Sequence, residues 1–162
     1  MKSVWTMVVA VLMVSVPLFA ATSQKEKKEK EKEEQTQEVI VNYEVIQQGT
    51  YSGKKDAYAE VIDNEAKWMD LWKQHVSVLV PQPPAPEIDF AGNVVAAIFA
   101  GEKTTGGYAV VIKNVVADAD DVVVHYRITE PQPNSFTLQV ISQPYAMVRI
   151  AKPKGVVKLL KE

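Results

Sequence analysis

The chain has 162 residues, with 18 lysines and arginines against 20 aspartates and glutamates, a formal net charge of −2, and no cysteine. This near balance of charge excludes the strongly basic surface typical of nucleic-acid binding, so we expect no nucleic-acid partner. The lack of cysteine excludes disulfides, thiolate metal sites and a cysteine nucleophile.

The start of the chain is predicted to be a signal peptide covering residues 1–23. Lys2 gives the positive end, residues 4–16 are almost wholly apolar, and small residues follow. We therefore expect an exported protein, periplasmic or extracellular, with no membrane span once the signal is cleaved. The alternative is an uncleaved N-terminal helix that anchors the protein, although an apolar stretch of about 18 residues is only marginally long enough to cross a bilayer.

Residues 24–38 are predicted to be a charged linker of lysine and glutamate. The segment has no hydrophobic side chain, so it cannot bury apolar surface to offset the entropy lost on ordering. The remaining residues, 39–162, are predicted to form a single domain, since about 124 residues can bury a substantial core.

The first half of the domain is predicted to contain two strands and a helix. β-branched residues at 39–46 and 57–62 indicate strands separated by a polar turn. Asp63 or Asn64 then stands in the N-cap position of a helix over residues 65–76. Apolar residues of this helix repeat at i, i+3, i+4 and i+7, a stripe that should pack against the sheet. The four positions are Trp68, Leu71, Trp72 and His75.

The second half of the domain is predicted to consist mainly of strands. They cover residues 94–100, 108–112, 122–128, 136–141 and 146–150, with a stiff proline-rich connector before them and an acidic turn at 118–121. The residue pattern does not predict a secondary structure for the apolar tail at 156–160. Many strands, one helix and no strand–helix–strand alternation indicate an α+β fold, mainly antiparallel β-sheet or sandwich with one amphipathic helix packed on it.

The most distinctive local feature is the polar loop at residues 101–108, which the flanking strands present as the tip of a predicted hairpin. Paired glycines allow positive φ and close approach of another backbone, and lysine and threonine add donors. We predict a partner-binding site formed by Lys103, Thr104, Thr105, Gly106, Gly107 and Tyr108. The alternative is a long hairpin loop whose glycines serve turn geometry alone. A phosphate-binding loop is excluded, because the lysine precedes the glycine pair and a strand follows.

The residues offer no catalytic constellation, no metal site and no cofactor motif, so we expect a protein that is not an enzyme. His75 belongs to the helix stripe and is expected to be a half-buried packing residue, whereas His125 is expected on the solvated face of its strand. Neither histidine has a zinc-type partner at i+4. The acidic turn at 118–121 lacks the glycine and distal glutamate of a calcium loop, which leaves an ordinary turn as the favoured interpretation.

With these residues laid out, the domain resembles the PrcB family of protease-complex subunits, specifically their C-terminal domain. The resemblance covers residues 58–153. It is carried by the helix stripe from Trp68 to His75, by Ile88-Asp89-Phe90, by residues 94–101 and 103–108, and by Pro144-Tyr145-Ala146-Met147-Val148. The resemblance implies a secreted, non-catalytic accessory module that docks on or stabilises a protein partner, such as an extracellular or periplasmic protease complex.

Three other interpretations stay open on the sequence alone, the last of them a purely structural, stalked envelope protein with no specific ligand. The first is a protease inhibitor that uses the 101–108 loop, since a threonine–threonine–glycine loop on a β scaffold is similar to the wedge loops of chagasin-type inhibitors. The second is an enzyme with an unrecognised carboxylate or tyrosine site, which a deep polar pocket would reveal.

Overall fold

The computed structural model describes residues 39–162. The predicted signal peptide (1–23) and charged linker (24–38) lie outside these residues. The described part has two four-stranded sheets, in the orders β1-β5-β6-β8 and β2-β7-β4-β3. The strands are β1 (Val39–Ile40), β2 (Tyr43–Gly49), β3 (Ala57–Ile62), β4 (Asn93–Ala100), β5 (Ala109–Asp118), β6 (Asp121–Thr129), β7 (Tyr145–Ala151) and β8 (Val157–Lys161).

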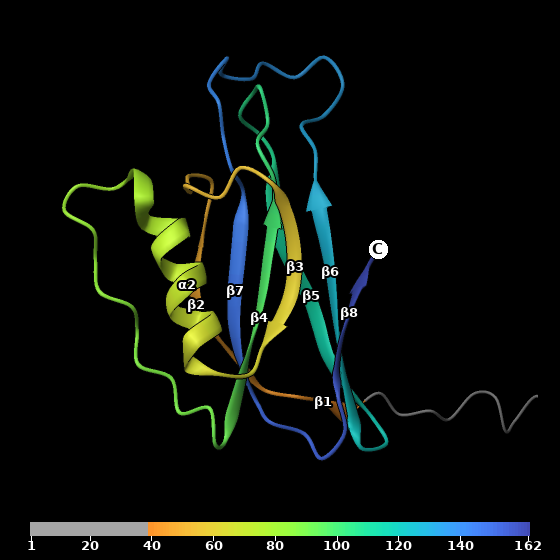
Figure 1. Cartoon of the computed structure of the whole chain (residues 1–162). Coiled ribbons are helices and arrows are strands. Elements are labelled where there is room, and N and C mark those ends of the chain that lie inside the picture. Colours follow the sequence, from red (N-terminus) through yellow and green to blue (C-terminus); the bar gives the residue numbers. More distant parts are fainter. Residues whose placement is uncertain (1–38) are drawn as a thin grey trace, which may run out of the picture. The chain divides into compact units, whose positions relative to one another are not determined.

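The one α-helix among these residues, α2 (Glu65–His75), covers the outer face of the β2-β7-β4-β3 sheet, as Figure 1 shows. Asn64 caps it by accepting a hydrogen bond from the backbone N–H of Lys67 at 3.0 Å. A short 3-10 turn, η1 (Val76–Val78), follows. The predicted stripe is confirmed, because the buried residues of α2 are Trp68, Leu71, Trp72 and His75. Two mainly antiparallel sheets with one helix packed on one of them confirm the predicted α+β class.

Strand β4 lies at the centre of the packing, with seven successive buried residues from Val94 to Ala100. Val95, Ala97 and Phe99 pack in the cluster that contains the helix tryptophans. Val94 and Ala96 pack instead with residues of the opposite sheet, such as Val124. Alternate side chains of one strand thus fill two separate apolar layers, since successive residues of a strand point to opposite faces.

The predicted hairpin between β4 and β5 is wrong, because these strands belong to different sheets. The loop at 101–108 carries the chain across from one sheet to the other. The hairpin that does occur joins β5 to β6, where Asp118 pairs with Asp121 across the predicted acidic turn. Ala119 takes φ of 55° in this tight connection.

Two further strand predictions need correction. The predicted strand at 39–46 is divided after Ile40, because β1 pairs with β5 whereas β2 pairs with β7 in the other sheet. Residues 136–141, which were predicted to be a strand, do not form one. The tail that the sequence left unassigned forms β8, which pairs in parallel with β6.

Candidate partner-binding site

The 101–108 loop is held in place by backbone hydrogen bonds at its first half. The N–H of Glu102 donates to the carbonyl of Lys55 at 2.8 Å. Lys103 and Ser142 exchange two hydrogen bonds, of 2.8 and 2.9 Å, in an isolated antiparallel bridge. These contacts join the loop to the segment before β3 and to the segment that leads into β7, so the loop has a defined conformation.

The two glycines of the loop have different roles. Gly107 has φ of +90°, and a Cβ atom there would lie 2.9 Å from the Cβ of Pro131. Both the backbone conformation and the space require glycine at this position. At Gly106 a Cβ atom would meet its nearest neighbour, the carbonyl oxygen of Leu138, at 3.7 Å, an ordinary contact. Only one of the paired glycines is therefore needed for geometry.

The other predicted binding residues lie along the same loop with different exposure. Thr104 is exposed, whereas Lys103, Thr105 and Tyr108 are partly buried. The carbonyl of Thr105 accepts a hydrogen bond from the hydroxyl of Ser142 at 3.0 Å. The ammonium group of Lys103 lies 5.4 Å from the ring centre of Tyr108, within the range of a cation–π contact. The loop thus offers a hydroxyl, an ammonium group and an aromatic ring on one fixed backbone.

The structure brings to this loop an apolar segment that the sequence did not assign to a site. Gly106 donates its N–H to the carbonyl of Leu138 at 2.9 Å. Around this contact four apolar side chains are exposed, by 50% to 95%: Phe136, Leu138, Val140 and Ile141. We call residues 103–108 together with these four side chains the tip surface. Both segments lie at the upper end of the molecule in Figure 1.

The histidines do not contribute to the tip surface. The ring nitrogens of His75 lie 2.9 Å from the hydroxyl of Ser52 and 3.1 Å from the side-chain oxygen of Gln47. His75 is 1% exposed, more deeply buried than the sequence predicted, and this burial lowers its pKa. Ser52 is equally buried, so this serine–histidine pair cannot meet a substrate from solvent.

His125 is also less exposed than predicted, because its ring pairs with the carboxylate of Glu162 at 3.1 Å. In the acidic turn, Asp121 accepts hydrogen bonds from Lys158 and from the N–H of Val156, which lower its pKa. Within residues 39–162, no group of three acidic or histidine side chains lies close enough to hold a metal ion.

The fold and the loop geometry together define a two-sheet domain with a covering helix and an ordered loop that continues its central strand. Residues 94–151 of this domain match the family model described as PrcB C-terminal. The match runs from β4 to β7 and includes the whole 101–108 loop, so the resemblance is confirmed over this segment. No curated protein and no solved structure was found to match the chain. Among the described residues, no helix is long and apolar enough to cross a membrane.

Proposed function

We propose that this protein is a non-catalytic accessory subunit that docks on a protease complex through its tip surface. The family match supports the association with a protease complex, since it covers the strands and the loop that carry this surface. The role is that of a binding module, which positions or stabilises its partner. Export to the periplasm or the extracellular space is part of the proposal and rests on the predicted signal peptide.

The observation that carries the proposal is the exposed apolar cluster beside the loop. Phe136 is 95% exposed and Leu138 is 64% exposed, although the same domain buries large aromatic side chains such as Trp68 and Tyr145. Exposed apolar groups that gather with polar donors around them are typical of protein-interaction sites. A partner that covers Phe136 would gain apolar burial, and the tip surface also offers the hydroxyl of the exposed Thr104 as a hydrogen-bond group.

The proposal is tested by capturing partners from the native envelope with the purified mature protein and identifying them by mass spectrometry. We expect a protease or a subunit of its complex, and at least a ten-fold loss of its recovery with Phe136→Ser. Val80→Ser is the matched control, because Val80 is 98% exposed in the connector after α2 and does not belong to the tip surface. Equal recovery with both variants would contradict docking at the tip.

Peptidase activity of the captured complex distinguishes support from inhibition. An accessory subunit should leave or raise the activity when added in excess, whereas an inhibitor that inserts the 101–108 loop should lower it. Loss of inhibition in a Thr104→Ala/Thr105→Ala double variant would identify the loop as the inhibitory element and overturn the supporting role.

A further inference from the structure

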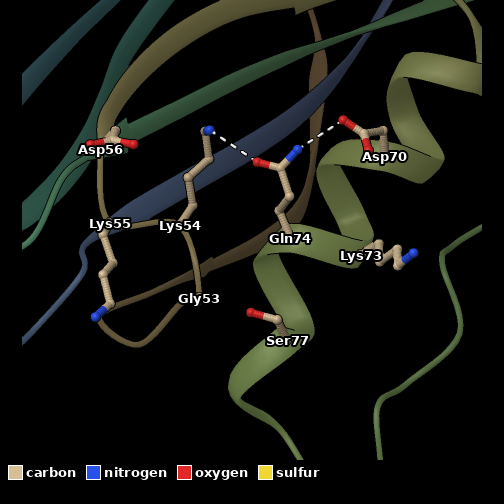
Figure 2. Close-up of a pocket in the computed structure, with 8 residues that line it drawn as sticks. All are labelled: Gly53, Lys54, Lys55, Asp56, Asp70, Lys73, Gln74 and Ser77. Carbon is tan, nitrogen blue, oxygen red and sulfur yellow. Dashed lines mark hydrogen bonds between the residues drawn. The ribbon is translucent and has the colours of Figure 1, made fainter.

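A polar groove lies between helix α2 and strand β3, and none of the residues of the tip surface lines it. It consists of two hollows, of about 500 Å³ and about 240 Å³. Lys54, Asp70 and Gln74 line both hollows, so the two adjoin, and we call them together the α2–β3 groove. Figure 2 shows the larger hollow, which the loop at 53–56 and the last turns of α2 enclose.

The loop at 53–56 is fixed against the end of the helix. Gly53 donates its N–H to the carbonyl of His75 at 2.8 Å. A Cβ atom at Gly53 would lie 2.0 Å from the hydroxyl of Ser77 and 2.4 Å from the carbonyl of Gln74, so a side chain there would push the loop off the helix. Lys54 reaches across the opening to Gln74 at 3.3 Å, and Gln74 in turn donates to Asp70 at 2.8 Å (Figure 2). The walls of the groove are therefore positioned before any ligand arrives.

Strand β3 forms one wall of the groove and is an edge strand, paired only with β4. Ala100 of β4 donates its N–H to Pro144 on the β7 side. Since the hydrogen-bonding direction alternates along an antiparallel strand, Phe99 turns its backbone groups toward β3 and pairs with Tyr58. The backbone N–H and C=O groups of Ala57 and Ala59 then point away from β4, toward the open edge.

The open part of this edge is short and sterically accessible. Ala57 and Ala59 are exposed, and their small side chains leave room for another backbone. Further along, Val61 packs in the core with Val157 and Leu159 of β8, so that end of the edge is covered. An extended segment can thus add beside residues 57–59, the mode of recognition known as β-augmentation.

The charges favour a carboxylate at one end of such a segment. The larger hollow is lined by three lysines (Lys54, Lys55 and Lys73) and two aspartates (Asp56 and Asp70), an excess of one positive charge. The ammonium group of Lys55 also lies 4.0 Å from the carboxylate of Glu102. β3 runs away from this cluster, from Ala57 toward Ile62. A segment that pairs antiparallel with β3 therefore ends, at its C-terminus, beside the lysines.

We propose that the α2–β3 groove binds the extended C-terminal segment of a partner protein. The main chain of the segment pairs with Ala57 and Ala59, and its terminal carboxylate lies at the end of the groove that Lys54, Lys55 and Lys73 line. This peptide site does not depend on the tip surface and goes beyond the docking proposed above.

The test uses the purified chain labelled with ¹⁵N and a pool of acetylated hexapeptides randomised at every position, either with a free C-terminal carboxylate or amidated. We expect the free-carboxylate pool to shift the amide resonances of Ala57, Ala59 and Lys54. The amidated pool should bind about five-fold more weakly, which corresponds to about 1 kcal/mol at 25 °C. Equal effects of the two pools, or no shift at Ala57 and Ala59, would overturn the proposal.

Ala59→Pro is the decisive variant. Its N–H points to the open edge, and proline is tolerated on an edge strand where the missing N–H would face solvent. The β3–β4 ladder should stay intact, with an unchanged pattern of resonances elsewhere, while peptide binding is lost. Lys73→Ala should weaken binding of the free-carboxylate pool only, whereas Lys113→Ala, on an exposed position of β5, should have no effect. Full peptide binding by folded Ala59→Pro would contradict edge pairing.

The two proposals fail independently. Capture of a partner that survives Ala59→Pro but is lost with Phe136→Ser supports the tip surface alone. Hexapeptide binding that survives Phe136→Ser supports the groove even if the captured partner is no protease.

Discussion

The indole N–H of Trp72 donates a hydrogen bond to the carbonyl oxygen of Pro83, with 3.0 Å between nitrogen and oxygen. Trp68 makes the same contact with Pro86 at 2.9 Å. The two tryptophans therefore bury their rings against the sheet and, with their polar edges, hold the proline-rich connector along α2. The stripe that the sequence predicted as core packing also fixes the path of the chain after the helix.

Replacement of Trp72 by alanine should lower the free energy of unfolding by about 3–5 kcal/mol, because the large buried ring leaves a cavity. Trp72→Phe should cost less, since most apolar contact remains and the main loss is the hydrogen bond to Pro83, about 1 kcal/mol. Met69→Ala is the control, because Met69 is 50% exposed on the same helix. Urea denaturation measures all three, and a loss with Trp72→Ala no larger than that of Met69→Ala would contradict the burial.

Stability should decline in mild acid because of His75. Burial holds its pKa in the folded state below the ordinary value of 6.5. The unfolded chain therefore takes up a proton first as the pH falls, and the stabilising effect of the neutral ring, complete above about pH 6.5, is lost as the pH falls toward the folded-state pKa. Melting temperatures between pH 7.5 and pH 5 should show this loss. His75→Gln should make the profile flatter, and an unchanged profile in this variant would contradict the assignment of the acid sensitivity to His75.

The two loop glycines should respond differently to alanine. Gly107→Ala should destabilise the domain by about 1–2 kcal/mol or more, because alanine must adopt positive φ and its Cβ would crowd Pro131. Gly106→Ala should stay within about 0.5 kcal/mol of the wild type, as expected where a methyl group meets only ordinary contacts. Thermal melts of the two single variants measure the difference, and equal losses would show that Gly106 also carries strain.

The charged linker should not contribute to folding. A chain that begins at Glu38 should melt at the same temperature as one that begins at Gln24, because the residues between them have no hydrophobic side chain to bury. Differential scanning calorimetry of the two chains tests this. A lower melting temperature for the shorter chain would indicate that the charged segment docks on the domain.

The sequence predicted the local elements better than their partners. The cap at Asn64 and the spacing of Trp68 and Trp72 are local signals, and they placed the helix correctly. The pairing of β4 was missed because a polar loop between two apolar runs has the same composition whether it turns within one sheet or crosses to another. Only long-range packing distinguishes these outcomes, and a single sequence does not display it.

The candidate sites illustrate the same limit. Residues 103–108 were proposed as a binding site from their residue types alone, which can be read directly from the sequence. The run from Phe136 to Ile141 was assigned to a strand from its residue pattern between two proline-containing turns, whereas the structure forms no strand there and leaves Phe136 exposed. The α2–β3 groove could not be predicted, since it depends on the distance between Gly53 and Ser77 and on which backbone groups of β3 face outward.

Strand β4 has a consequence for how the domain loses its structure. Its odd-numbered side chains belong to the layer under the helix, and its even-numbered side chains belong to the layer against the other sheet. Neither layer can unfold while the other stays folded, because both layers depend on the backbone of β4. The tip surface begins where this strand ends. If a partner docks there as proposed, its affinity should persist with little change up to the temperature of global unfolding and then disappear in one step.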